Sequence, residues 1–503
     1  MVPAATPSRL VSRAMSDLLF RPATELAELV RSGELSAREL VQASLDRIDA
    51  LDPELNAFVD VFHDDALAAA DAVVPGDERP FAGVPIAIKN NRAIAGRRLT
   101  FGAELFGDWE APYDHNVVRR FKEAGFVIVG TTTLPEWGIL PWTNTKRFGP
   151  TRNPWDPART SGGSSGGSAT AVAAGMVPIA HGNDGGGSTR IPAACCGLVG
   201  LKPQRNRISF APEITESFLA VDGVLSRTIE DTARALDLLA GYEPGDGSWA
   251  PPPAEPFASA AAGEPGALRV AVATNPPVDA PVDPARADAA RDAGRLLESL
   301  GHHVEEAEVP WRDDTLLEAF TALFAPLVML QVAFGRILTG REPTEEQMEP
   351  VSWALWQLVN RMSSLDTHLA GARMQLFARG LVGWMSQYDL VVAPSLAEPP
   401  LLLDEVDWRT DDAMGLFVRS AAFTPYTAVA NVTGQPAISL PLAEHEGLPV
   451  GVQLFGRPAQ EGQLLAVSAQ LEAARPWAQR RPELAARCDG SDPGRATRPG
   501  PLG

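Results

Sequence analysis

Lysine is scarce in this sequence: of its 43 Lys and Arg residues, four are lysines, namely Lys89, Lys122, Lys146 and Lys202. Arginine stays protonated at working pH, whereas a desolvated lysine can lose its proton, so a lysine in an apolar setting is a candidate base. Lys89 fits this description because it ends the apolar, strand-like run GVPIAIK at 83–89. Taken alone, Lys89 has a second explanation, a strand-end side chain that reaches solvent.

Cysteines and long apolar runs are also scarce. The chain has 3 cysteines without a disulfide framework or metal-ligand spacing, which suggests a reducing compartment. No stretch approaches the roughly 20 apolar residues of a membrane span, and the N-terminus does not resemble a secretory signal. The net charge of −20 argues against nucleic acid or an anionic membrane as the main partner. We therefore expect a soluble, cytoplasmic protein.

The apolar periodicity predicts an α/β fold with a buried sheet, because short buried strands alternate with helical segments. The expected strands are 84–88, 126–129, 177–180, 268–272, 390–392, 437–440 and 450–455, and the expected helices between the early strands are 116–124 and 168–174.

We expect one large domain over residues 1–487. It opens with a helical segment at about 16–60 and carries an inserted helical cover, rich in Trp, Met, Leu and Phe, at about 315–385. The Pro- and Ala-rich stretch 251–265 is predicted to be a loop, and the Gly-, Pro- and Arg-rich tail 488–503 to be disordered.

Two serine–glycine clusters stand out, GGSSGGSA at 162–169 and NDGGGSTR at 183–190. Glycine allows a backbone to fold tightly around hydroxyl groups, which is the layout of a serine nucleophile with N–H donors aimed at an oxyanion. The first cluster also matches a nucleophile elbow, but loop-like residues precede it instead of a strand. A flexible linker fits badly because a helix and a strand follow, and a phosphate loop lacks its lysine. For the second cluster alone, a tight turn is the alternative.

Together with GVPIAIK, the two clusters resemble the amidase signature family over most of the chain. The spacing fits, since Ser164 lies 75 residues after Lys89 and Ser188 lies 24 residues after Ser164. Within that family the chain is most similar to the 6-aminohexanoate-cyclic-dimer hydrolases. Further matching segments are TRNPW at 151–155, GLVGLKP at 197–203 and GQPA at 434–437.

The resemblance implies the amidase signature fold, a mixed central β-sheet covered by helices on both faces. It also implies a Ser–Ser–Lys triad. Ser188 would be the nucleophile, and Ser164, preceded by a cis peptide bond, would relay its proton to Lys89. Burial would keep Lys89 neutral, because desolvation lowers the pKa of an amine. An acyl-enzyme would form and water would hydrolyse it.

The resemblance also assigns an oxyanion hole to the second cluster. The implied donors are the backbone N–H groups of Gly185, Gly186, Gly187 and Ser188. Many family members carry Thr, Ile or Leu where this chain has Gly185, a departure that keeps the backbone donor. Ser165, Asp184 and Arg190 resemble support positions of the two loops, although Asp184 and Arg190 could simply pair with each other.

The segment after LPE at 134–136 resembles the part of the family that lines the acyl pocket. Candidate pocket residues are Trp137, Gly138, Ile139 and Trp142, with core packing as the alternative for each tryptophan. A mostly apolar cover favours bulky, uncharged amides. The candidate substrates are linear or cyclic amino-acid oligomer amides, aryl acylamides and aryl carbamates.

The predicted function is hydrolysis of amide C–N bonds in a small molecule by a monomer or homodimer, with no cofactor and no metal. One alternative is a glutamine-hydrolysing, amidotransferase-like subunit that acts with a partner protein. A more distant one is a Ser-His-Asp esterase, which would use one of the histidines His302, His303, His368 and His445.

Overall fold

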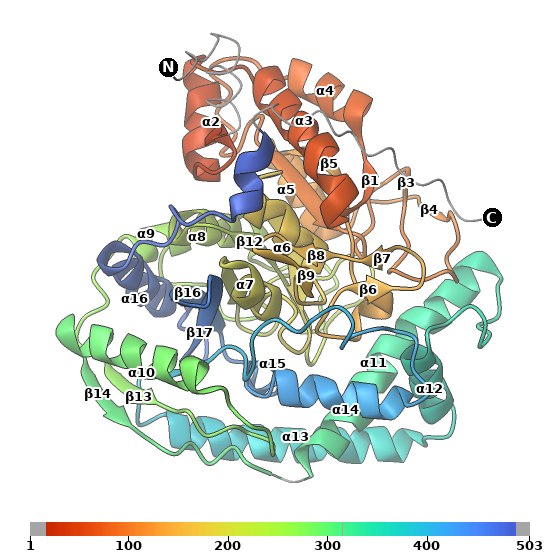
Figure 1. The fold of residues 1–503 in the computed structure, drawn as a ribbon, viewed down its shortest axis with the longest axis vertical. Coiled ribbons are helices and arrows are strands. Elements are labelled where there is room, and N and C mark those ends of the chain that lie inside the picture. The colour runs from red at the N-terminus through yellow and green to blue at the C-terminus, as the bar shows by residue number, and fades with distance from the viewer. Residues whose placement is uncertain (1–16, 314, 489–503) are drawn as a thin grey trace, which may run out of the picture.

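An eleven-stranded mixed sheet forms the centre of the protein, in the order β1-β5-β2-β10-β12-β11-β16-β17-β15-β13-β14 (Figure 1). The computed structural model describes residues 17–313 and 315–488. The strands of this sheet are β1 (Phe58–Val61), β2 (Pro85–Lys89), β5 (Val127–Thr132), β10 (Ile179–Asp184), β11 (Val199–Lys202), β12 (Val221–Ser226), β13 (Arg269–Val272), β14 (His303–Glu306), β15 (Leu390–Pro394), β16 (Ala437–His445) and β17 (Leu448–Gly456).

The sheet is parallel in two places and antiparallel elsewhere. Strand β2 pairs in parallel with β5 and β10, and β13 pairs in parallel with β14 and β15. The other neighbours are antiparallel. Three small two-stranded sheets lie outside it, formed by β3 (Arg97–Arg98) with β4 (Glu110–Ala111), β6 (Asn144–Thr145) with β7 (Gly149–Pro150), and β8 (Arg152–Asn153) with β9 (Asp156–Thr160).

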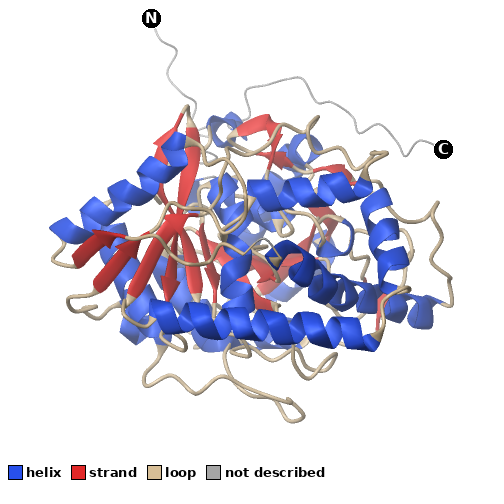
Figure 2. Cartoon of the chain, turned by 90° about the horizontal axis from the view of Figure 1, so that it is seen from below, coloured by secondary structure: helices blue, strands red, loops and turns tan. Residues whose placement is uncertain are grey.

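Helices cover both faces of the sheet, and Figure 2 shows its strands as a twisted fan between them. The predicted fold class is therefore confirmed. The helices are α2 (Ala23–Ser32), α3 (Ala37–Leu55), α4 (His63–Asp71), α5 (Asn116–Glu123), α6 (Gly166–Ala173), α7 (Arg190–Cys196), α8 (Ile229–Leu239), α9 (Phe257–Ala261), α10 (Pro284–Ser299), α11 (Leu316–Thr339), α12 (Pro350–Val359), α13 (Ser364–Met385), α14 (Ala413–Phe423), α15 (Thr427–Thr433) and α16 (Glu461–Ala474), with 3-10 turns η1 (Glu136–Gly138) and η2 (Glu483–Cys488).

The structure changes three of the predicted segments. The helical segment predicted at about 16–60 ends with helix α3, and strand β1 follows it. The predicted loop 251–265 contains the short helix α9, which packs on α8 and α16. The cover predicted at 315–385 is three separate helices, α11 to α13. Residues 489–503 of the predicted disordered tail lie outside the described residues.

Helix α11 corrects the expectation that no stretch approaches the length of a membrane span. It has 24 residues, and its most apolar 18-residue window has a mean hydropathy of 1.8, so it is long and apolar enough by length and composition. Core helices of globular proteins pass the same test, but in α11 28% of that window is buried. Here α11 packs against α12 and α13 and lines the cavity described below.

Candidate active site

The candidate site lies where two neighbouring parallel strands end. Lys89 is the last residue of β2, and Asn183 and Asp184 are the last two residues of β10. Because β2 and β10 pair in parallel, their carboxyl ends meet at the same edge of the sheet. This edge is where α/β proteins place their ligands.

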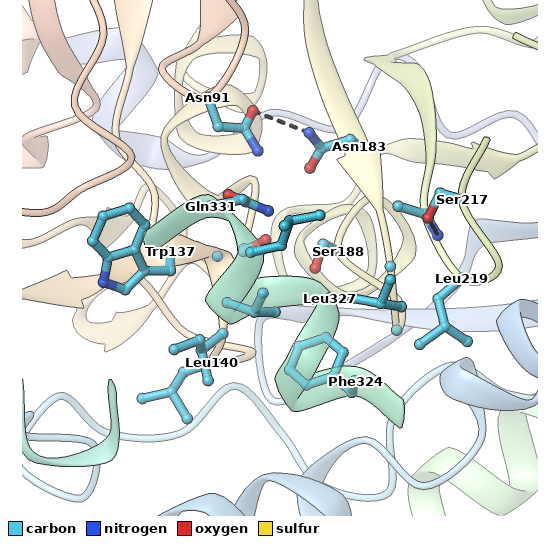
Figure 3. Close-up of a pocket in the computed structure, with 18 of the residues that line it drawn as sticks. Asn91, Trp137, Leu140, Asn183, Ser188, Ser217, Leu219, Phe324, Leu327 and Gln331 are labelled. Carbon is cyan, nitrogen blue, oxygen red and sulfur yellow. Dashed lines mark hydrogen bonds between the residues drawn. The ribbon is translucent and has the colours of Figure 1, made fainter. Parts of the chain in front are cut away.

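Lys89 is fully buried and has two polar neighbours. Its Nζ lies 2.8 Å from Ser164 Oγ and donates to Asn183 Oδ1 at 2.7 Å. The amide of Asn183 donates in turn to Asn91 Oδ1 at 3.0 Å, a contact visible in Figure 3. Since the oxygen of Asn183 can only accept, one N–H of the amine is directed to it, and the side of the amine that faces Ser164 is free to exchange a proton.

The surroundings of Lys89 favour its neutral form. Burial lowers the pKa of Lys89 well below its usual 10.5, and the charge of Arg92 lowers it further, against the opposing effect of Asp222 and Asp184. Arg92 is itself paired with Asp222, with Nε to Oδ1 at 2.9 Å, so much of its charge is balanced. Desolvation of Lys89 is therefore the main cause of the shift.

Ser164 stands in a tight loop just before helix α6. The Gly163–Ser164 peptide bond is cis, and the Ser164 side chain is 2% exposed. A Cβ on Gly163 would lie 2.7 Å from Leu140 O and from Trp142 N, so only glycine fits there. The glycines of the first cluster thus serve close backbone packing around Ser164.

Ser188 immediately precedes Thr189, the N-cap of helix α7, and lines the same cavity as Ser164. Its Oγ has no hydrogen-bond partner within residues 17–313 and 315–488, and no hydrogen bond joins Ser164 Oγ to Ser188 Oγ. The backbone ties the two loops together instead, since Ser165 N donates to Ser188 O at 3.2 Å. The structure therefore contains the Lys89–Ser164 hydrogen bond, and the Ser188 hydroxyl has no hydrogen-bond partner among the described residues.

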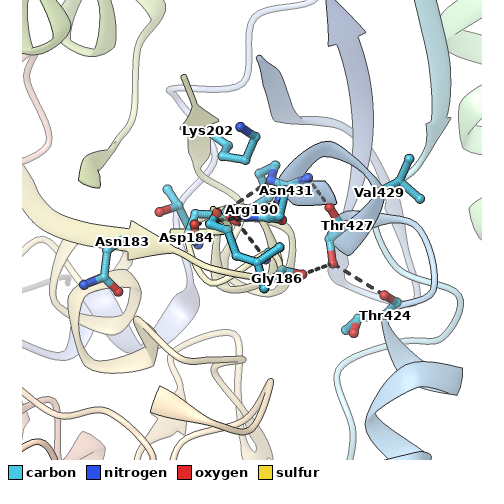
Figure 4. A network of polar contacts seen from close by, with 12 residues as sticks. Asn183, Asp184, Gly186, Arg190, Lys202, Thr424, Thr427, Val429 and Asn431 are labelled. Atoms are coloured by element: carbon cyan, nitrogen blue, oxygen red, sulfur yellow. Dashed lines mark hydrogen bonds and ion pairs between the residues drawn. The ribbon is translucent and has the colours of Figure 1, made fainter. Parts of the chain in front are cut away.

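A buried ion pair holds the second serine–glycine loop (Figure 4). Arg190 donates to both carboxylate oxygens of Asp184, at 2.9 and 2.8 Å, and both side chains are buried. Asn431, on α15, donates to the Asp184 carboxylate at 2.9 Å and accepts from Arg190 at 2.7 Å. Burial alone would raise the pKa of Asp184, but Arg190 and Asn431 lower it to about 2.

The backbone donors of this loop are not equivalent. The N–H of Gly187 donates to Asp184 Oδ1 at 2.8 Å. This bond occupies the donor that Gly187 was expected to offer to the oxyanion. The N–H groups of Gly185, Gly186 and Ser188 have no hydrogen-bond partner in the described part of the chain. These three remain available to a ligand.

A cavity of about 680 Å³ opens at this edge of the sheet, a size suited to a small organic molecule. Ser164, Ser188, Gly185 and Gly186 lie on its wall. Figure 3 shows Ser188 among the lining residues. Much of the remaining lining is apolar and comes from α11, α13 and α14, notably Leu317, Phe320, Phe324, Leu327, Val328, Phe334, Leu338, Phe377 and Phe417.

The predicted pocket residues divide between the cavity wall and the core. Trp137, Gly138 and Ile139 line the cavity. Trp142 does not, and it is fully buried among core residues, so core packing is the correct explanation for it. The Ser-His-Asp esterase alternative would use one of the histidines His302, His303, His368 and His445. None of the four lines this cavity, so that alternative has no geometric basis.

Three polar residues of the site were not predicted as such, namely Asn183, Asn431 and Thr427. Thr427 Oγ1 donates to Gly186 O at 2.7 Å and Asn431 binds the Asp184 carboxylate, so both hold the second loop from α15. Asn183 lies within the second cluster, and its position beside Asp184 is the sequence feature that could have identified it as a site residue. Asn431 and Thr427 lie more than 200 residues from the loop that they hold, and no spacing pattern points to them.

Most of the chain matches known proteins. The family model described as Amidase matches residues 39–465. The 6-aminohexanoate-cyclic-dimer hydrolase of Paenarthrobacter ureafaciens is 37% identical over 489 residues, which cover 93% of this chain and 97% of that protein. The solved structure of 6-aminohexanoate cyclic dimer hydrolase matches with a TM-score of 0.88 at 37% identity, covering 93% of this chain and 99% of that one. That of a bacterial aryl acylamidase matches with a TM-score of 0.84 at 27% identity, covering 94% and 99%.

Proposed function

The chain belongs to the amidase family and is a hydrolase of amide bonds, and from this premise we propose that it works through an acyl-enzyme on Ser188, with Ser164 and Lys89 as its proton relay. The observation that carries the proposal is the buried amine of Lys89, which lies 2.8 Å from Ser164 Oγ at the wall of a cavity that Ser188 also lines.

The proton path runs from Ser188 through Ser164 to Lys89. As Ser188 Oγ attacks the amide carbonyl, its proton passes to Ser164 Oγ and the proton of Ser164 passes to the Lys89 amine. The link between the two hydroxyl groups forms when substrate is bound, since catalytic hydrogen bonds often tighten only in the complex. The relay then runs in reverse to protonate the leaving amine, and water hydrolyses the acyl-enzyme.

The oxyanion is stabilised by the unpartnered N–H groups of Gly185, Gly186 and Ser188. Asp184 acts as a positioning residue, because it fixes Gly187 and Arg190 and thereby the shape of the loop. Loss of one well-placed oxyanion donor typically costs about 3–4 kcal/mol of transition-state stabilisation.

The lining of the cavity favours a bulky, largely apolar amide as substrate. Side chains from α11, α13 and α14 offer little to a small polar molecule such as glutamine. The amidotransferase alternative is therefore not favoured. Amino-acid oligomer amides and aryl acylamides match the cavity, and an aryl carbamate offers the same carbonyl to Ser188.

The test is the Ser188→Ala variant assayed on p-nitroanilides of apolar acids. We expect turnover to fall by a factor of about 10⁴ or more, as for loss of a serine nucleophile. Glutamine tested beside the anilides should not be hydrolysed by the wild-type chain. Retained anilide turnover in Ser188→Ala would rule out the proposed nucleophile.

A matched control is Ser161→Ala. Ser161 is a buried serine that precedes the first cluster, donates to Thr151 O and does not line the cavity. This variant should keep its turnover, which separates loss of the nucleophile from a general disturbance of the loops.

A further inference from the structure

A second cavity, of about 770 Å³, adjoins the cavity that Ser188 lines. It lies between the C-terminal half of α13, the segment 205–218 and the end of α15. Three residues line both cavities and therefore form the wall between them: Glu216, Ser217 and Val432. Figure 3 labels Ser217 among the residues of the Ser188 cavity. The proposed triad does not line the second cavity, so this cavity is a separate space with its own chemistry.

Arg205 is a fixed cation in the wall of the second cavity. Its Nη2 donates to Asn431 O and to Val432 O, both at 2.8 Å, and its guanidinium carbon lies 4.0 Å from the centroid of the Phe218 ring. Its Nη1 has no hydrogen-bond partner among the described residues and keeps accessible surface, whereas the unpartnered Nε is closed off. Arg205 therefore offers N–H donors to a ligand from a side chain that is already held in place.

The positive charge of this wall is not balanced by the protein. Burial lowers the pKa of Arg205 to about 10, so the guanidinium stays protonated at neutral pH, and no described carboxylate pairs with it. Arg379, on α13, also lines the cavity and has no ion pair in the described part of the chain. The one carboxylate of the lining, Glu216, accepts from Ser248 Oγ instead. A bound anion would offset the cost of a partly buried, unpaired charge.

Apolar side chains also line the second cavity, namely Phe218, Ala378, Val382 and Val432. An inorganic anion would contact the arginines only, whereas an acid with a hydrocarbon chain would also bury that chain against these side chains. The combination of two arginines with an apolar surface therefore favours an amphiphilic acid over a small inorganic anion.

We propose that the second cavity is a binding site for an organic acid, whose carboxylate binds Arg205 and Arg379 and whose hydrocarbon chain lies against the apolar side chains. The choice of ligand rests on the proposed function, because hydrolysis of an apolar amide releases such an acid from Ser188, on the other side of the shared wall. Arginine binds carboxylates through paired N–H···O bonds that a neutral molecule of the same length cannot replace.

The experiment is calorimetric titration with octanoate and with 1-octanol, a neutral molecule of equal chain length. The variant is Arg379→Gln, since Arg205 also holds the end of α15. We expect a site that binds octanoate at least about tenfold more tightly than 1-octanol, and that Arg379→Gln weakens at least about tenfold for octanoate alone. Equal affinities for the two molecules, or octanoate binding unchanged in Arg379→Gln, would overturn the proposal.

Arg373→Gln is the matched control. Arg373 is an exposed arginine of the same helix that lines neither cavity, so this variant should keep the affinity for octanoate. An equal loss in Arg373→Gln would assign the effect to the overall charge of the helix and contradict a site at Arg379. Inorganic phosphate provides a second arm, because binding as tight as that of octanoate would contradict an organic acid as the ligand.

A covalent block separates the two cavities. In protein whose Ser188 has reacted with a decyl fluorophosphonate, the site that depends on Arg379 should bind octanoate with unchanged affinity. Loss of that site on modification would place the acid in the Ser188 cavity and overturn the proposal. If the reagent does not react with Ser188, the proposed serine mechanism fails, whereas the titrations of Arg379→Gln and Arg373→Gln need no turnover and still decide whether the acid site exists.

Discussion

The serine–glycine loops and the cover helices α11, α13 and α14 line the same cavity and are built on opposite principles. In the loops, buried polar groups pair with one another: the Asp184 carboxylate meets Arg190, Asn431 and two backbone N–H groups. In the cover, apolar side chains dominate and several remain exposed, such as Ile337, which is 69% exposed.

This difference assigns catalysis to the serine–glycine loops and substrate selection to the cover helices. A polar network in a dry site keeps its donors in place because every member is fixed by others, so a single change affects the whole site. An apolar wall contributes area, and each side chain adds a small, nearly independent amount of binding. Changes in the loops should therefore abolish catalysis or folding, whereas changes in the cover should alter substrate affinity.

The largest effect is expected for Lys89→Met, which removes the base but keeps an apolar chain in the buried position. We expect kcat to fall by a factor of about 10⁴, as for loss of a member of a catalytic triad. The matched control is Lys202→Met, since Lys202 is also buried with a lowered pKa, but its amine donates to Pro203 O, whereas that of Lys89 bonds to Ser164. Similar losses of kcat in the two variants would contradict the role of Lys89.

The second effect concerns the charge that holds the loop. Asp184→Asn leaves Arg190 buried without its counter-charge, and breaking a buried pair in this way typically costs about 3–5 kcal/mol of folding free energy. Urea titrations measure the loss. Asp77→Asn, which breaks a more exposed pair with Arg79, should cost less than about 1 kcal/mol. Equal losses in the two variants would mean that the buried pair does not hold the loop.

A third prediction tests the boundary between the two regions, where the carboxylate of Glu136 binds the start of helix α12. Glu136, beside Trp137, accepts from the backbone N–H of Glu349 at 2.9 Å, at the start of α12. Burial raises the pKa of Glu136 to about 7, and burial together with Glu136 raises the pKa of Glu349 well above its usual range.

The direction of the pH dependence of stability follows from these raised pKa values. Above about pH 4.5 the unfolded chain has lost protons that the folded pair still holds, so the pair's contribution to stability falls as pH rises towards 7 and beyond. Glu349→Gln removes the part of this dependence that comes from Glu349, whereas the part that comes from the buried Glu136 remains. Between about pH 5 and pH 8, the free energy of unfolding should therefore fall less steeply with rising pH in the variant than in wild type. Parallel stability curves would show that Glu349 does not hold a proton in the fold at a pH where the unfolded chain has lost it.

The smallest effect is expected in the cover itself. Phe324→Ala removes one aromatic side chain from the cavity wall and should raise KM for an apolar anilide by about five- to tenfold, with kcat changed little. Ile337→Ala, on the same helix but away from the cavity, should leave both constants unchanged. A fall in kcat as large as that of Lys89→Met would contradict the division between the two regions.

The sequence predicted the local parts of the site because each is a short segment with its own chemistry. The strand that ends at Lys89 and the two serine–glycine clusters can be recognised without the rest of the chain. Strand bounds shifted by a few residues, as β10 continues to Asp184 instead of ending at 180, because pairing with β12 extends it.

Contacts between distant segments could not be predicted. Asn431 reaches Asp184 across 247 residues, and only the folded chain brings them together. The bond from Gly187 to Asp184 depends on the exact course of the loop. Trp137 and Trp142 look alike in sequence, and only packing assigns one to the wall and the other to the core.

The most direct test is to react the protein with an alkyl fluorophosphonate and locate the adduct by peptide mass spectrometry. An activated serine displaces fluoride and forms a stable O–P bond, so the label marks the nucleophile. We predict a single adduct on Ser188, absent in Ser188→Ala and formed at least about 100-fold more slowly in Lys89→Met. An adduct on another residue, or labelling of Lys89→Met at the wild-type rate, would contradict a Ser188 nucleophile activated by a buried lysine.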